Sequence, residues 1–189
     1  FAISFIFVAT FSHGNPINSA VFFYNYEGLQ FQATDPELFQ GGVSNIPESE
    51  IYGAEVELST YLTDSMILDA NLSWIETEIT ADHFALDNVQ SDIATNALLA
   101  QGVNQFSDQV QIARAAEITN VKGNELAKTP NFTANLALTW EGYVENWGEL
   151  TNSLQYIYRG DFKHRMFNNP LTDMAVSYTH LRAHETINH

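Results

Sequence analysis

The segment from Ile51 to Glu78 alternates apolar and polar residues twice, on either side of the turn Thr63-Asp64-Ser65. Successive side chains of a strand point to opposite faces of a sheet, so each half has one apolar and one polar face. The apolar positions are Ala54, Val56, Leu58, Leu62, Leu68, Ala70, Leu72 and Trp74, and the polar positions between them are Glu55, Glu57, Ser59, Asp69, Asn71 and Ser73. The pattern predicts a β-hairpin with water on one side and an apolar environment on the other.

Other segments have the same character. Five strands are predicted, over 20–31, 53–62, 66–79, 132–140 and 150–158, with Gly28 as a bulge or kink in the first. Most approach or exceed the roughly 9–11 residues of a tilted membrane-spanning strand, whereas soluble strands usually have about 5–6.

The connections between these strands alternate in length. The link over 32–52 is long, 63–65 is minimal, 80–131 is very long, 141–149 is short, and another long one begins near Asp161. Long structureless loops are uncommon in compact soluble domains, but a transmembrane barrel has short periplasmic turns and long extracellular loops. A short helix is predicted within 80–131, with Ser91 or Ser107 as its N-cap.

Aromatic residues gather near the predicted strand ends. Trp140, Tyr143 and Trp147 flank a short turn, and Trp74, Tyr156 and Tyr158 approach long loops, as two girdles at the headgroup levels would. Aromatic residues are also ordinary strand formers, which is the competing interpretation.

The fold class that follows is all-β, an antiparallel up-and-down transmembrane β-barrel fragment of five to six strands. Residues expected to face the lumen are Glu55, Glu57, Asn71, Ser73, Asn135 and Thr139, and those expected to face lipid are Leu58, Leu72, Leu136 and Leu138. The alternative fold is a soluble carbohydrate-binding or hydrolytic β-sandwich, in which a second sheet covers the apolar faces.

Composition excludes several classes of function. The chain has 7 Lys and Arg against 23 Asp and Glu, for a net charge of −16, which argues against nucleic-acid binding. It has no cysteine, so disulfides and thiolate metal sites are excluded. No run of about 18 apolar residues predicts a membrane-spanning helix.

Few residues have the type and spacing of a catalytic or binding site. Glu55 with Glu57, or Glu76 with Glu78, resemble paired catalytic carboxylates only in spacing, and acids on a barrel's lumen or rim explain them more simply. No catalytic, cofactor-binding or metal-ligating residue is assigned, and the chain is not expected to be an enzyme. The basic residues Arg159, Lys163, His164 and Arg165 are expected at the outer rim, where they balance an acidic surface or attract anionic ligands and phosphate groups.

Several segments together resemble the barrel of TonB-dependent outer-membrane receptors over roughly residues 17–173. The segments are Asn18–Tyr26, Ile51–Leu58 (IYGAEVEL), Leu68–Trp74, Gly123–Phe132 (GNELAKTPNF) and Tyr156–Gly160. The second carries the Tyr/Gly pair followed by Glu-x-Glu-Leu that opens a descending strand in this family, and the fourth resembles its Gly-Asn…Pro lead-in to the next one.

The resemblance implies a receptor in the bacterial outer membrane. Such receptors bind iron–siderophore complexes or similarly bulky nutrients and import them through a plugged barrel, using energy from the TonB complex. A passive porin is the alternative that shares the barrel. The sequence does not indicate which ligand is carried or which loop residues bind it.

The resemblance also suggests how the chain is divided. Residues 17–175 are expected to be the barrel segment. Residues 1–16 are expected to be a partial strand or a spurious start, and 176–189 (VSYTHLRAHETINH) a non-native tail. The plug, the TonB box and the remaining strands are expected to be missing. In the tail, His180 and His184 have the spacing of a helical metal-binding pair, but no third acidic ligand has a defined position beyond nearby Glu185, so no metal site is assigned.

Overall fold

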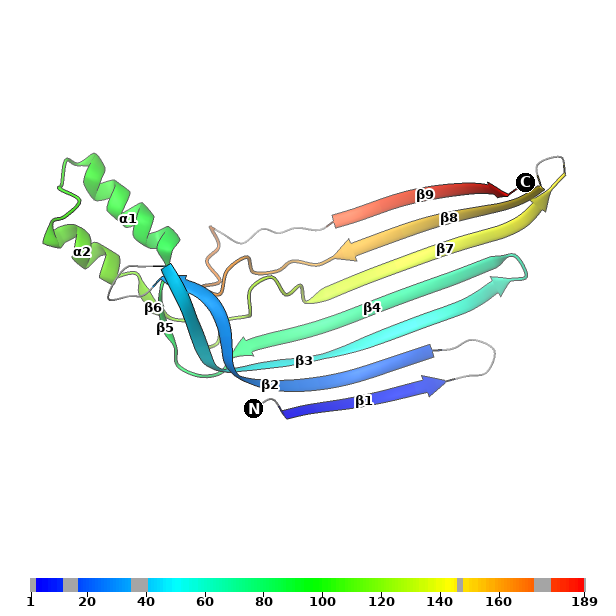
Figure 1. Ribbon diagram of the computed structural model, residues 1–189, viewed down its shortest axis with the longest axis horizontal. Helices are drawn as coiled ribbons and strands as arrows, with labels where there is room; N and C mark the ends of the chain where they lie inside the picture. The colour runs from blue at the N-terminus through cyan, green and yellow to red at the C-terminus, as the bar shows by residue number, and fades with distance from the viewer. Residues whose placement is uncertain (1–2, 12–16, 35–40, 146–147, 172–177, 189) are drawn as a thin grey trace.

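The described part of the chain forms a seven-stranded antiparallel sheet in which neighbours in space follow one another along the chain. The computed structural model describes residues 3–11, 17–34, 41–145, 148–171 and 178–188. The strands of this sheet, in order across it, are β1 (Ile3–Phe11), β2 (Ile17–Thr34), β3 (Gly41–Thr63), β4 (Met66–Ile79), β7 (Phe132–Val144), β8 (Gly148–Arg159) and β9 (Tyr178–Asn188). Figure 1 shows one curved layer of strands. This is the up-and-down order of a barrel wall that is not closed.

All five predicted strands are confirmed, and β4 begins and ends at the predicted residues. Others are longer than predicted, most of all β3, which begins at Gly41 and includes Pro47. The sheet also has two strands outside the five, β1 and β9, so it exceeds the expected five to six. β9 pairs along its whole length with β8.

The two ends of the sheet differ as expected. At one end, β3 turns into β4 through Asp64 and Ser65, and Thr63 is the register partner of Met66. The Ser65 N–H donates to Thr63 Oγ1 at 3.3 Å, and the Ser65 carbonyl accepts from the Glu141 N–H at 2.9 Å. Strand β7 ends and β8 begins at this same end, and the long excursion between β4 and β7 lies at the other (Figure 1).

The strand register separates an apolar face from a polar face. Val56, Leu72 and Ala134 lie side by side across β3, β4 and β7. On the opposite face, Glu55, Ser73 and Thr133 lie side by side across the same strands. The four predicted lipid-facing leucines are on the apolar face, and the six predicted lumen-facing residues are on the polar face.

The apolar face is not covered by a second layer of the described residues. Val21 is 57% exposed, and Leu154 is 48% exposed. The other sheet in the described part of the chain has only two three-residue strands, β5 (Phe84–Leu86) and β6 (Ile118–Asn120). The β-sandwich alternative needs a second sheet over this face, so that prediction is not supported.

A row of aromatic side chains crosses the apolar face near the long-loop end. Its members are Phe23, Tyr52, Trp74, Phe132 and Tyr158. The rings of Tyr52 and Trp74 meet edge to face at 5.9 Å, and those of Phe132 and Tyr158 lie 6.0 Å apart. From Phe132 to Trp140, near the opposite end of the same strand, is about 27 Å along β7. With the strand tilt of about 35–45° found in membrane barrels, this is a rise of roughly 19–22 Å, which fits within their apolar band of about 25 Å.

Two of the predicted girdle residues do not follow this scheme. Tyr156 is the register partner of Leu136, so it lies in the middle of the wall and not at its outer end. Tyr143 is on the polar face, opposite Glu149, because it is an odd number of residues from Trp140. Trp147 lies outside the described residues.

The excursion from 80 to 131 contains more helix than predicted. Helix α1 (Asn88–Ala100) has 13 residues and α2 (Asp108–Ala115) has 8. The N-cap of α1 is Asp87 and not Ser91, which is buried inside the helix. Ser107 is the N-cap of α2 as predicted, although its side chain makes no capping hydrogen bond. Among the described residues, no helix combines the length and apolar character needed to cross a membrane.

Gly28 gives β2 a kink without shifting its register. Glu27 pairs with Glu48 and Leu29 with Ile46, so the count between the strands is the same on both sides of Gly28. Gly28 lies opposite Pro47 and has a φ of +71°, which side chains disfavour. Proline has no N–H to donate, so the pairing is weakest where the strand bends. Beyond this point the hairpin curves toward α1 (Figure 1).

The excursion is closed at its base by a small apolar core. Five buried side chains from β3, β4 and the following segments form it: Ile46, Ile79, Val121, Leu126 and Met166. The backbone closes the same junction, since the Ile79 N–H donates to the Asn124 carbonyl at 2.9 Å and the Gly123 N–H to the Ile79 carbonyl at 2.8 Å. Gly123 has a φ of +81°, which explains the glycine of the Gly-Asn pair in the sequence. The chain therefore returns to β4 before entering β7.

Candidate functional site

The polar face of the wall carries a shallow hollow of about 380 Å³. Five of the six predicted lumen-facing residues line it: Glu55, Glu57, Asn71, Ser73 and Asn135. Thr139 is farther along the same face, where its hydroxyl donates to Ser153 Oγ at 3.4 Å. Gln155 Nε2 donates to Asn135 Oδ1 at 2.9 Å, which ties neighbouring strands together. This side of the sheet presents polar groups as the lumen side of a barrel would.

A second and larger hollow of about 830 Å³ lies where the long connections meet, and we call it the loop-end hollow. It is lined by the distal part of the β2–β3 hairpin, the start of α1, the lead-in to β7 and the segment after β8. Its lining residues are Phe31, Gln32, Gly41, Gly42, Val43, Asn88, Ala127, Lys128, His164, Arg165, Met166 and Phe167. Four parts of the chain that are far apart in sequence therefore build one surface.

The lining of the loop-end hollow has the opposite charge to the rest of the chain. It includes Lys128, Arg165 and His164, and among the described residues no Asp or Glu lines it. The chain as a whole has a net charge of −16. Phe31 and Phe167 add aromatic surface beside the cations. A basic and aromatic hollow in an acidic protein favours an anionic ligand with apolar or aromatic parts.

Lys128 is held in place by its backbone. It has a φ of +62°, and its N–H donates to the Lys163 carbonyl at 2.6 Å. This hydrogen bond joins the lead-in to β7 with the segment after β8. No local sequence pattern indicates a role for Lys128, because this tertiary contact is what brings the residue to the hollow.

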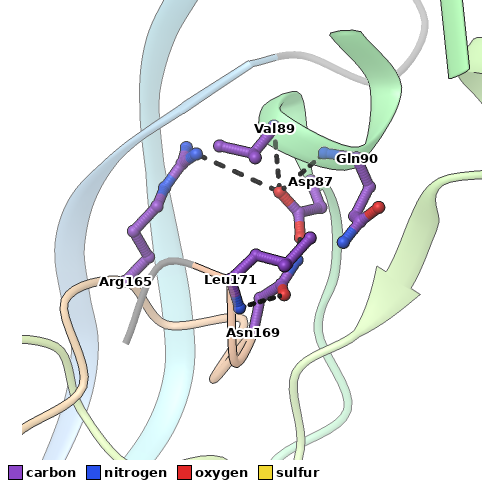
Figure 2. Close-up of polar contacts among 6 residues, drawn as sticks. All are labelled: Asp87, Val89, Gln90, Arg165, Asn169 and Leu171. Atoms are coloured by element: carbon purple, nitrogen blue, oxygen red, sulfur yellow. Dashed lines mark hydrogen bonds and ion pairs between the residues drawn. The ribbon is translucent and has the colours of Figure 1, made fainter. Parts of the chain in front are cut away.

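Arg165 is positioned by a ring and by a buried carboxylate. Its guanidinium carbon lies 5.6 Å from the centroid of the Phe167 ring, and its Nη1 lies 4.0 Å from Asp87 Oδ1. Figure 2 shows Arg165 reaching toward Asp87 from the segment after β8. Asp87 was missed as a functional residue, although an aspartate just before a helical segment is a recognisable N-cap signal.

The predicted basic cluster is divided by the structure. His164 and Arg165 line the loop-end hollow, but Arg159 lines the hollow on the wall. Arg159 is the last residue of β8 and pairs with Thr133, so it belongs to the polar face of the sheet. The cluster was inferred from closeness in sequence, and the chain leaves the wall between these residues.

The carboxylate and histidine pairs noted in the sequence lie in strands β3, β4 and β9. Glu55 and Glu57 lie exposed on the polar face, and Glu76 pairs with Tyr52 on the other face. His180 and His184 are in strand β9, where residues four apart are separated by about 13 Å and not by one helical turn. Within the described ranges, no group of three or more His, Cys, Asp or Glu residues could hold a metal ion.

His83 joins the excursion to the β2–β3 hairpin. Its ring meets the Phe31 ring edge to face at 5.5 Å, and its Nε2 lies 3.3 Å from Ser44 Oγ. Burial lowers the pKa of His83 below its ordinary value of 6.5, because the charged imidazolium loses hydration there. The neutral form is therefore the one that fits this contact.

We expect this contact to weaken in acid. The pKa of His83 is lowered in the folded state, so the open state binds the proton more tightly. His83 therefore leaves the free energy of opening unchanged above about pH 6.5 and reduces it as the pH falls further. Hydrogen exchange of the Val121 amide, which donates to the His83 carbonyl at 2.9 Å, should accelerate between pH 7 and pH 5 after correction for the intrinsic rate. His83→Gln should flatten this response, and an unchanged acid response in that variant would contradict the assignment.

Comparison with known proteins adds to this geometry. The family model described as TonB dependent receptor-like, beta-barrel matches residues 7–182. Among solved structures, the chain is similar to the ferric yersiniabactin uptake receptor FyuA from Yersinia pestis, with a TM-score of 0.65 and 14% identity. The similarity covers 97% of this chain and 22% of that receptor, so the chain spans about a fifth of its length. No curated protein sequence matches.

Proposed function

Because the chain belongs to the TonB-dependent receptor β-barrel family, we propose that it forms wall and outer surface of a receptor for an anionic ferric siderophore or a similarly bulky nutrient. Barrels of this family lie in the bacterial outer membrane, and the family is one of receptors and transporters and not of enzymes. A passive porin, the alternative considered from the sequence, is not favoured by this membership.

The observation that carries the proposal is the basic lining of the loop-end hollow. Iron(III) held by three catecholates forms an anionic complex with aromatic edges, which Lys128, Arg165 and the two phenylalanines would suit. The FyuA receptor, whose fold this chain shares, is an uptake receptor for ferric yersiniabactin. In this proposal the remaining barrel, a plug and the TonB complex complete the transport machinery, and outer-membrane lipid covers the apolar face.

The proposal is tested by removing the two cations from the hollow. In the full-length receptor that carries this segment, the double variant Lys128→Gln/Arg165→Gln should bind ferric tris-catecholate about 10- to 100-fold more weakly, since two charge-assisted contacts are lost. Binding is measured by quenching of intrinsic fluorescence. Binding of a neutral ferric tris-hydroxamate should change little.

Lys122→Gln is the matched control, because Lys122 pairs with Asp82 at 3.8 Å and is not among the residues that line the hollow. It should leave both affinities unchanged. The proposal is wrong if the double variant binds the anionic complex as tightly as the wild type, or if it loses the neutral complex to the same extent.

A further inference from the structure

We propose that Asp87 is an internal counter-ion that an anionic ligand must displace from Arg165 before it can occupy the loop-end hollow. This inference rests on the proposed function, because it concerns regulation of the same hollow. In this role Asp87 positions Arg165 and competes with the ligand for its guanidinium, and this is distinct from its role as the N-cap of α1.

The first step is that Asp87 holds Arg165 at the back of the hollow. Asp87 is 5% exposed, and its Oδ1 lies 4.0 Å from Arg165 Nη1. Arg165 lines the hollow, whereas Asp87 is not among its lining residues. The carboxylate thus sits behind the guanidinium and reduces the positive charge that an anion entering the hollow would meet.

The second step is that Asp87 does not depend on Arg165. Its Oδ1 also accepts from the N–H groups of Val89 at 3.0 Å and Gln90 at 3.5 Å, and its Oδ2 accepts from Asn169 Nδ2 at 3.1 Å. Figure 2 draws the contacts of Asp87 with Val89 and Gln90 together with its ion pair with Arg165. The N-terminal end of α1 also favours a negative charge at this position. If Arg165 turns away, the buried carboxylate therefore keeps its other donors and remains satisfied.

The third step is that Arg165 can turn without losing its own support. Its contact with the Phe167 ring is independent of Asp87, and Phe167 also lines the hollow. An anionic ligand can therefore accept from the guanidinium while the guanidinium stays over the ring. The exchange replaces one counter-ion of Arg165 by another, which makes the hollow selective for ligands whose charge is strong enough to compete.

The experiment separates this role from capping. Asp87→Asn removes the charge but keeps a good N-cap residue, so α1 and the fold should be preserved. In the full-length receptor, Asp87→Asn should bind ferric tris-catecholate about 3- to 10-fold more tightly than the wild type, since a partly buried ion pair no longer competes. The gain should disappear in the Arg165→Gln background, where there is no guanidinium to release.

Asp92→Asn is the matched control, because Asp92 is an exposed acid on the same helix. It should raise the affinity far less than Asp87→Asn does. Equal gains in the two variants would overturn the proposal, since general charge would then explain them. An unchanged or weaker affinity in Asp87→Asn, or a gain that persists with Arg165→Gln, would overturn it as well.

Failure of the inference can be told from failure of the proposed function. If the receptor binds the probe through Lys128 and Arg165 but Asp87→Asn has no effect, only the counter-ion role is refuted. If the wild type does not bind the anionic probe at all, the proposed function is refuted, and the counter-ion role with it.

Discussion

Replacing Leu136 with Arg should destabilise the barrel by about 2–4 kcal/mol, because the charge would lie at the middle of the apolar band. Leu136 is on the apolar face between Ala70 and Tyr156. It is halfway along β7 between Phe132 and Trp140, the aromatic residues near the two ends of this face. The free energy is measured by urea unfolding of the full-length receptor in phospholipid vesicles.

Asn135→Arg is the matched control, one residue away on the opposite face. Asn135 lines the hollow on the polar side and accepts from Gln155 Nε2, so a long cation there can extend into water. We expect a cost below about 1 kcal/mol, roughly the value of the lost hydrogen bond. Equal costs at the two positions would show that the faces of the sheet are assigned wrongly.

Replacing Ile79 with Ala should release the excursion from the wall. Ile79 is 0% exposed and belongs to the core with Ile46, Val121, Leu126 and Met166. Truncating a fully buried isoleucine removes apolar contacts and leaves a cavity, which costs about 2–5 kcal/mol. The free energy of local opening is measured by hydrogen exchange of the Gly123 and Leu126 amides, which bond to the Ile79 carbonyl and to Thr77 Oγ1.

The matched control is Ile112→Ala on α2, where the same change is made at a side chain that is 69% exposed. We expect it to shift the opening free energy by less than about 0.5 kcal/mol. If Ile79→Ala protects these amides as well as the wild type does, the small core does not hold the excursion in place.

The wall was predictable from the sequence because alternation is a local signal. Met66–Ile79 was predicted to the residue, since from Leu68 to Trp74 the apolar positions face one side and the polar positions the other. The distal half of β3 was missed because Gly41, Gly42 and Pro47 are typical of loops. Pairing with β2 over this stretch overrides that local preference.

The loop-end hollow could not be predicted, because its parts come from four separate segments. Lys128 and Arg165 are brought together by the backbone contact between Lys128 and Lys163 and by the small core below them, neither of which has a signal of its own in the sequence. Helix α1 begins earlier than the sequence predicts, since Ser91 is the expected cap. Asp87, four residues earlier, makes the capping hydrogen bonds.

The hydrogen bonds that join Ile79 to Gly123 and Asn124 bring the two ends of the excursion to one point on β4. Residues 80–122 therefore begin and end beside Ile79, so their number does not affect how β4 pairs with β7. That segment can therefore be lengthened, shortened or exchanged while the wall keeps its architecture.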